Sequence, residues 1–226
     1  MLSVLDKILL NDNVVDEFYK HYCDGEFRRW LINLIPEVED CKNLKQDNPW
    51  HIYNCLDHIL HSVEEMNKQS VKMDGDVRRM LAYTMFFHDM GKPECYIRRY
   101  SKLYGREIDS FFNHNKASVK IASRVLPSFN FDENRMKIIN TLVDKHDIFM
   151  SLTLVDDGNH YHRVLTEDYV EDLVTELNNV GNGEEIINYL IMVGRSDNLS
   201  QNPKMTGNAL KLLDVMQGMA SNVNRI

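Results

Sequence analysis

The chain has 226 residues, with 26 Lys and Arg against 34 Asp and Glu, and therefore a formal net charge of −8. Its 43% hydrophobic and 27% charged residues are typical of a globular protein and argue against a disordered or low-complexity chain. The acidic balance also argues against nonspecific binding to nucleic acid, because such binding depends on surplus Lys and Arg.

The sequence predicts a cytoplasmic protein with no membrane partner. Its first residues lack the basic start and long apolar core of a signal peptide. No stretch approaches the roughly 18 consecutive apolar residues that span a bilayer. The four cysteines form no C-x-x-C motif, so we expect reduced thiols that fill core space.

Apolar residues spaced three or four positions apart indicate an all-α fold. They predict helices over 2–10, 14–22, 26–35, 50–67, 74–90, 114–126, 132–147, 166–179, 184–199 and 206–219. The stretch between the third and fourth helices is predicted to be irregular as far as Asn48-Pro49. Residues 96–112 fit either a loop or a small hairpin, and a short hairpin about a Gly turn is predicted near 151–164.

Several titratable side chains fall on the inward faces of these helices. His88 follows Val77, Leu81 and Thr84 by 11, 7 and 4 residues, and His114, His146 and Asp197 continue apolar stripes in the same way. A single inward His is most often a core residue bonded to a backbone carbonyl, and an Asp at a helix end is often a cap. Several His and two Asp together favour a metal site that activates water.

The motifs resemble a known family. The pattern H…HD…D, formed here by His58, His88-Asp89 and Asp197, resembles the HD superfamily of metal-dependent phosphohydrolases. The likeness is greatest to the HD region of bacterial CCA-adding tRNA nucleotidyltransferases and covers roughly residues 28–200. It is carried by Leu34-Ile35-Pro36-Glu37, Gln46-Asp47-Asn48-Pro49-Trp50-His51, Leu56-Asp57-His58-Ile59-Leu60-His61, His88-Asp89-Met90-Gly91-Lys92-Pro93, Gly105-Arg106, Phe112-x-His114, Ser118-Val119-x-Ile121-Ala122, Leu142-Val143-x-x-His146 and Arg195-Ser196-Asp197-Asn198.

The sequence also departs from that family. These residues contain no motif of a nucleotidyltransferase head, so we expect no nucleotide addition by that chemistry. The segment 151–165 is longer than the family's usual connection, and no Gly-Tyr-Pro signature follows His88-Asp89. The resemblance implies a single HD-type helical domain over 1–226, with an N-terminal helical extension at 1–27, an HD core at 28–200 and a C-terminal helix at 201–226.

Carried over residue by residue, the resemblance implies a divalent metal ion (Mn, Ni, Fe, Zn or Mg) bound by His58, His88, Asp89 and Asp197. His114 and His146 match positions that complete a second metal site in some members, and in others contact substrate or are packed. Asp89 and Lys92 are the expected catalytic residues. Asp89 would bridge two metals or orient the attacking water, and Lys92 would contact the substrate phosphate unless it is a solvated lysine at a helix end.

Other polar residues have weaker assignments. Arg98, Arg99, Lys102 and Arg106 place four cations within nine residues, which fits either a positive mouth that binds substrate phosphate or a solvated face. His61 fits either a residue supporting the metal ligands or an exposed helix histidine. We expect His51 to be supporting or structural, and His160 and His162 to lie on the surface.

The predicted function is hydrolysis of a nucleotide-like phosphate ester, by phosphomonoesterase or cyclic phosphodiesterase chemistry through a metal-activated water. The alternative is a metal-dependent module that binds a nucleotide or RNA end with little or no catalysis. A metal-indifferent helical adaptor is a third reading. The expected partners are a small phosphorylated substrate or an RNA end, and the sequence does not indicate an oligomeric state.

Overall fold

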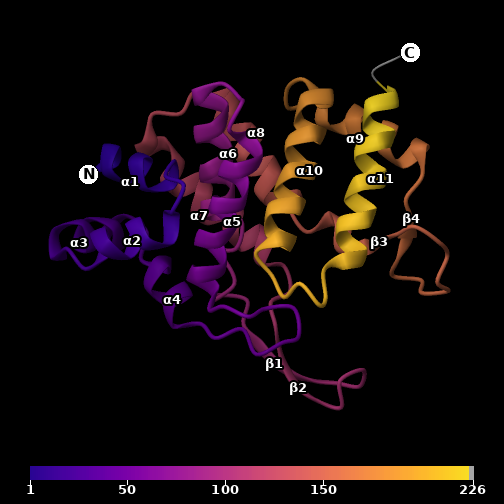
Figure 1. Cartoon of the computed structure of the whole chain (residues 1–226), viewed down its shortest axis with the longest axis horizontal. Helices are drawn as coiled ribbons and strands as arrows, with labels where there is room; N and C mark the ends of the chain where they lie inside the picture. Colours follow the sequence, from indigo (N-terminus) through magenta and orange to yellow (C-terminus); the bar gives the residue numbers. More distant parts are fainter. Residues whose placement is uncertain (224–226) are drawn as a thin grey trace.

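A computed structural model describes residues 1–223, and α-helices make up most of it (Figure 1). The all-α prediction is therefore confirmed. In chain order the elements are α1 (Leu2–Leu9), α2 (Val14–Tyr22), α3 (Gly25–Leu34), α4 (Glu37–Asn43), α5 (Cys55–Ser70), α6 (Gly75–Phe87), β1 (Ile97–Ser101), β2 (Arg106–Ser110), α7 (His114–Val125), η1 (Leu126–Phe129), α8 (Glu133–Lys145), η2 (Ile148–Ser151), β3 (Leu152–Thr153), β4 (Arg163–Val164), α9 (Glu167–Leu177), α10 (Gly183–Leu199) and α11 (Gly207–Val223). Residues 224–226 of the predicted C-terminal segment lie outside the described residues.

Helix α6 is the centre of the fold. Every residue from Met80 to Phe87 is buried, so this helix is apolar on all sides rather than on one stripe. It contacts α1, α5, α7, α8 and α10, which surround it. The C-terminal end of α6 therefore lies deep in the molecule, and the residues that follow it begin inside the core.

One cluster of buried apolar side chains runs from Leu5 to Ala220. Helices α1 to α4 lie together on one side of α5 and α6, while α10 and α11 lie on the other (Figure 1). No helix within residues 1–223 is long and apolar enough to cross a membrane.

Two helix predictions near residue 50 need correction. The predicted irregular stretch contains α4, whose Val38 and Cys41 are fully buried one turn apart. Helix α5 begins at Cys55 rather than at about 50, because the Asn54 side chain caps it by accepting a hydrogen bond from the Asp57 amide at 2.8 Å. His51 therefore lies in the loop before the helix.

The strand predictions were partly right. Strands β1 and β2 form an antiparallel hairpin, which settles the open choice for 96–112. At the predicted second hairpin, Leu152 and Thr153 pair with Arg163 and Val164, but in parallel. The intervening residues 154–162 must carry the chain back across, so this segment is a long loop and not a tight Gly turn.

Candidate metal centre

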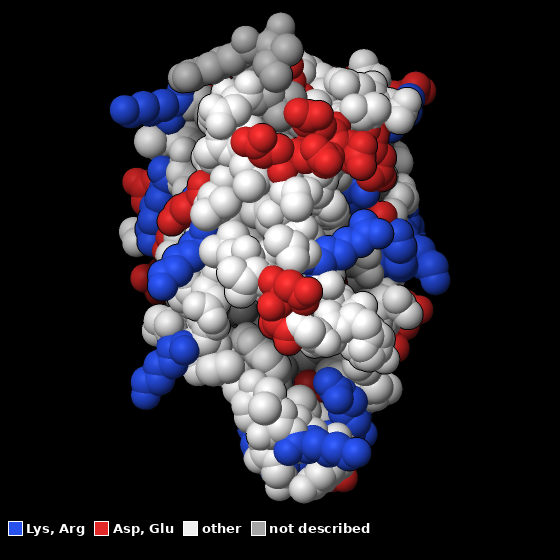
Figure 2. Space-filling model, turned by 90° about the vertical axis from the view of Figure 1, so that its right-hand side faces the viewer, with Lys and Arg blue, Asp and Glu red and all other residues white. Residues whose placement is uncertain are grey.

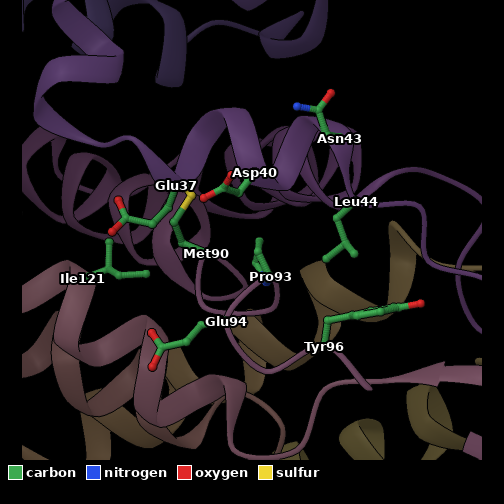
Figure 3. Close-up of a pocket in the computed structure, with 9 residues that line it drawn as sticks. All are labelled: Glu37, Asp40, Asn43, Leu44, Met90, Pro93, Glu94, Tyr96 and Ile121. Carbon is green, nitrogen blue, oxygen red and sulfur yellow. The ribbon is translucent and has the colours of Figure 1, made fainter. Parts of the chain in front are cut away.

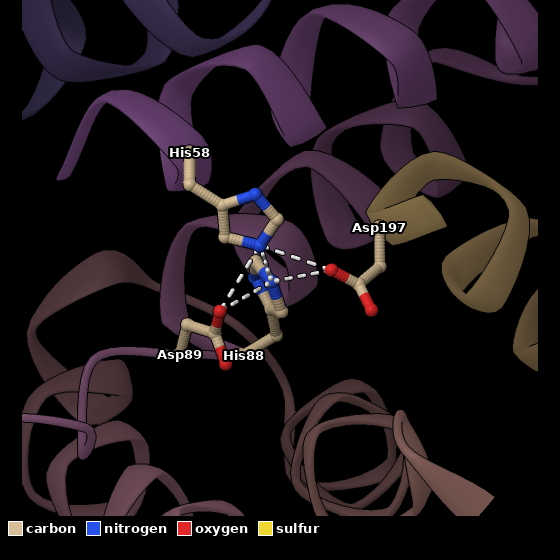
Figure 4. Close-up of side chains that lie close together, drawn as sticks. All are labelled: His58, His88, Asp89 and Asp197. Carbon is tan, nitrogen blue, oxygen red and sulfur yellow. Dashed lines mark hydrogen bonds and ion pairs between the residues drawn. The ribbon is translucent and has the colours of Figure 1, made fainter. Parts of the chain in front are cut away.

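The chemically important side chains meet because one end of each of five helices, either the first or the last turn, lies at the same place. His58 lies in the first turn of α5, and His114 is the first residue of α7. His88 and His146 directly follow the last residues of α6 and α8, and Asp197 lies two residues before the end of α10. Figure 4 shows His58, His88, Asp89 and Asp197 converging from α5, α10 and the turn after α6.

The turn after α6 is packed tightly against α7 through Gly91. The Gly91 amide donates to Ser118 Oγ at 2.9 Å. A Cβ at position 91 would lie 2.4 Å from the Ser118 backbone nitrogen and 2.6 Å from the His114 carbonyl oxygen. Only glycine permits this approach, which brings the first residue of α7 next to Asp89.

Asp89 lies between two groups of potential ligands. Its Oδ2 is 3.1 Å from His58 Nε2 and 3.3 Å from His88 Nε2. Its Oδ1 is 3.1 Å from His114 Nε2 and 3.5 Å from His146 Nε2. His58, His88, Asp89 and Asp197 form one group that could hold a metal ion, and Asp89, His114 and His146 form a second. One carboxylate therefore belongs to both.

The four imidazoles share one orientation: the Nδ1 of each lies near a backbone carbonyl oxygen, which can only accept. In the neutral imidazoles Nδ1 therefore carries the proton, and the Nε2 atoms face the carboxylates, which is the arrangement expected of metal-binding His. The acceptors are Ser200 O at 3.4 Å for His58, Met85 O at 2.6 Å for His88, Phe111 O at 2.8 Å for His114 and Val143 O at 2.7 Å for His146.

This arrangement requires positive charge between the imidazoles. The Nε2 atoms of His114 and His146 are 3.0 Å apart, and those of His58 and His88 are 3.4 Å apart. Two lone pairs at such distances repel unless a proton or a cation lies between them. Asp89 Oδ2 is also buried and has no hydrogen-bond partner of acceptable geometry. The donor set therefore fits a bound metal ion.

The pKa shifts of the cluster's side chains in the metal-free chain also favour binding of a cation. Burial opposes the ionised form of Asp89, but Lys92 and the surrounding imidazoles outweigh it and hold the pKa of Asp89 well below its ordinary value. Burial likewise disfavours protonated His88, but the Asp89 and Asp197 carboxylates raise the pKa of His88 to about 9. The carboxylates therefore stay charged and attract cations.

Lys92 is a buried part of this cluster and not a solvated lysine. Its side chain is 6% exposed, and its Nζ is 2.5 Å from Asp89 Oδ2. The other two partners of the ammonium are Gln46 Oε1 at 2.9 Å and His51 Nε2 at 3.0 Å. The ammonium therefore has an ion pair and two hydrogen-bond partners within the chain, and contact between Lys92 and a substrate phosphate stays a prediction.

His51 was expected to be supporting or structural, and it contacts Lys92. The predicted helix over 50–67 would include His51, but this residue lies in the loop before α5. Gln46 lies in a segment without periodicity, and it was named only within the motif that begins at this residue, with no role of its own. His61 belongs to neither ligand group; its Nδ1 is 3.0 Å from Glu64 Oε2. His160 and His162 are exposed, as expected.

The four cations predicted to form a phosphate-binding mouth all lie on or next to the β1–β2 hairpin, and they differ in their partners. Arg98 and Arg106 bind the same carboxylate, Asp47, at 2.9 and 2.8 Å, and so fix the loop before α5 to the hairpin. Arg98 also pairs with Asp109 at 2.7 Å. Arg99 and Lys102 have no carboxylate partner among residues 1–223.

A hollow of about 540 Å³ lies against the turn that follows α6 (Figure 3). Met90 contributes to its wall, together with the carboxylates of Glu37, Asp40 and Glu94. Among the described residues that line it there is no Lys, Arg or His, so it is unsuited to a phosphate. The chemistry therefore belongs to the His and Asp cluster and not to this hollow.

No family model matches the chain, and no curated protein matches it either.

Proposed function

We propose that this chain is a metal-dependent phosphohydrolase of the HD type that cleaves a nucleotide-like phosphate ester. The observation that carries the proposal is the position of Asp89, whose two oxygens each face a separate pair of His Nε2 atoms. A carboxylate shared by two ligand groups would let two ions bind side by side, as they do in the two-metal sites of phosphatases. The motif resemblance, from H…HD…D to H-D-x-G-K-P, supports the same function.

The chain's residues would divide the work as follows. His58, His88 and Asp197 would hold one ion, His114 and His146 a second, and Asp89 both. Divalent ions at these positions would neutralise phosphate charge and lower the pKa of a water so that it attacks at neutral pH. Lys92, itself held by Gln46 and His51, keeps the Asp89 carboxylate ionised and in position.

Asp197 is suited to handle the proton of the attacking water. Its side chain is 13% exposed, more than that of Asp89, so it lies on the open side of the cluster. Gln201 Nε2 donates to Asp197 Oδ1 at 3.0 Å, and the same oxygen faces His58. Asp197 Oδ2 is then the atom that accepts a proton from water in the proposed reaction.

The test is release of phosphate or nucleoside from a panel of nucleoside monophosphates, triphosphates and 2′,3′-cyclic nucleotides, with Mn, Ni, Mg or a chelator. We expect turnover of one class that needs metal and disappears in Asp89→Asn. The matched control is Asp6→Asn, which removes a carboxylate bound to Arg79 away from the cluster and should retain turnover. Both variants should keep the helical circular dichroism of the parent.

Four results would contradict the proposal. Turnover that survives Asp89→Asn would remove the assignment of the site, and so would turnover that survives chelation. Metal-dependent nucleotide binding without product over hours would favour the binding module. A protein that binds no metal would support the helical adaptor.

A further inference from the structure

A cation and an exposed aromatic ring form a pair beside the metal centre. The Phe112 side chain is 60% exposed, which is unusual for a ring of this size. The guanidinium carbon of Arg99 lies 5.3 Å from the centroid of this ring. Arg99 Nε donates to Ser110 Oγ at 2.7 Å, which holds the guanidinium in place while leaving its terminal nitrogens uncommitted to a carboxylate.

The backbone places this pair next to His114. Asn113, between Phe112 and His114, has φ 62°, so the chain reverses direction there. His114 turns inward, where its Nδ1 donates to the Phe111 carbonyl, and Phe112 turns outward. The His114 side chain is 12% exposed, so this side of the cluster reaches the surface beside Phe112.

The charge of Arg99 is available in a way that the charges of Arg98 and Arg106 are not. Arg98 pairs with Asp47 and Asp109, Arg106 pairs with Asp47, and these pairs attach the hairpin. Arg99 and Lys102 have no ion pair within the part of the chain that the structure describes. In the space-filling view, Lys and Arg atoms gather on the lower protrusion, which Figure 1 identifies as the β1–β2 hairpin (Figure 2).

We propose that Arg99 and Phe112 form a binding subsite for the nucleobase and a phosphate oxygen of the substrate. This inference rests on the proposed function and adds a recognition element to it. A base stacks on the face of Phe112 that Arg99 leaves open, and the terminal nitrogens of Arg99 pair with phosphate. The substrate is then a nucleoside phosphate and not a simple sugar phosphate.

Self-association through the same hairpin is less compatible with these residues. Symmetric pairing of two β1 strands would bring Arg98 and Arg99 of one copy against those of the other, and like charges directly opposite are destabilising. A phosphate-bearing ligand instead supplies the opposite charge that Arg99 lacks.

The experiment compares the best nucleotide of the panel with the same sugar phosphate lacking its base. We expect Phe112→Ala to lower kcat/KM for the nucleotide roughly ten-fold, the loss of one stacking contact, and to leave the base-free substrate unchanged. Phe112→Trp should retain the preference. Arg99→Ala should lower kcat/KM for both substrates, because both carry the phosphate. The matched control is Tyr100→Ala, which removes an equally exposed ring, 61%, whose strand position points to the opposite face.

A binding measurement separates failure of the subsite from failure of the proposed function. The fluorescence of 2-aminopurine riboside 5′-monophosphate is quenched by stacking, and we expect quenching by the parent protein and by Tyr100→Ala but not by Phe112→Ala. That result supports the subsite even if no substrate is hydrolysed. Equal quenching by Phe112→Ala, no quenching by the parent, or an unchanged substrate preference overturns it. A change in sedimentation of Phe112→Ala without a change in quenching assigns the ring to self-association instead.

Discussion

Lys92 shows how the charges of the cluster depend on one another. The ammonium is buried against Asp89, and Gln46 and His51 accept its remaining protons. A buried ion pair contributes little compared with an apolar pair of the same shape, but removing one partner leaves the other as an uncompensated charge. In this cluster a metal ion is an alternative source of positive charge for Asp89.

We therefore expect Lys92→Met to destabilise the chelated protein by about 3–5 kcal/mol, the cost of leaving Asp89 without its cation. With saturating Mn the loss should be smaller, because the metal supplies the missing charge. Urea unfolding with and without chelator measures both values. The control is Lys145→Met, which removes a pair with the exposed Glu176 and should cost under about 1 kcal/mol in either condition. An equal loss for Lys92→Met in both conditions would show that metal and lysine do not share Asp89.

The second ligand group can be tested separately from the first, because His114 and His146 belong to the second group alone. We expect the parent protein to bind two Mn ions per chain, and His114→Ala or His146→Ala to retain one, because His58, His88 and Asp197 remain. Metal content after gel filtration, measured by atomic emission, gives the ratio. His61→Ala is the matched control, since this helix histidine pairs with Glu64 and belongs to neither group. A single ion in the parent, or two in His146→Ala, would contradict the second site.

At the scale of elements, the site forms where the ends of five helices meet, and Gly91 packs against α7 so tightly that a Cβ there would overlap it. A methyl group there would meet backbone atoms of α7, which cannot rotate away as a side chain can. We expect Gly91→Ala to destabilise the protein by about 1–3 kcal/mol and to lower metal content, because α7 must move and His114 moves with it. Thermal unfolding and metal analysis test this.

The control for that variant is Gly218→Ala in the last helix. Nothing lies within 4 Å of a Cβ at position 218, and the residue is exposed in the interior of α11. Alanine should therefore stabilise the protein by about 0.5–1 kcal/mol through its lower backbone entropy. If both glycine variants behave alike, the packing of the turn against α7 is not what positions His114.

Periodicity and motifs could place much of the site from the sequence, including Asp89 and Lys92 in the turn after α6, but the contacts made from the loop before α5 could not be predicted. His88 and Asp197 continue apolar stripes of α6 and α10, so periodicity alone placed them inward. Gln46 and His51 lie in a loop whose path is set by distant ion pairs, such as Arg98 and Arg106 with Asp47. Local periodicity carries no information about such contacts.

The same limit explains the errors in the elements. Helix α4 is short and mostly charged, and its contacts with α3 and α5 stabilise it, so its few apolar residues gave a weak signal. Arg163 and Val164 do pair near the predicted position, but the direction of the pairing depends on the long loop before them and not on the Gly turn motif.

At the scale of the whole molecule, the candidate ligands join parts of the chain that are far apart in sequence. They run from His58 to Asp197 and come from α5, the turn after α6, and the ends of α7, α8 and α10. A ligand that binds only where these five segments meet stabilises the folded state and not the unfolded chain, in which the segments are dispersed.

We therefore expect Mn at a hundred-fold excess over its dissociation constant to stabilise the protein by about 2.7 kcal/mol, and a chelator to abolish this gain. Unfolding in urea followed by circular dichroism gives the free energy at each metal concentration. Asp89→Asn should lose most of the dependence on metal, because Asp89 is common to both ligand groups, whereas Asp6→Asn should keep it. Equal stabilisation of Asp89→Asn and the parent would mean that the metal binds elsewhere on the chain. If metal stabilises the parent and Asp6→Asn but not Asp89→Asn, then the metal binds where the five segments meet.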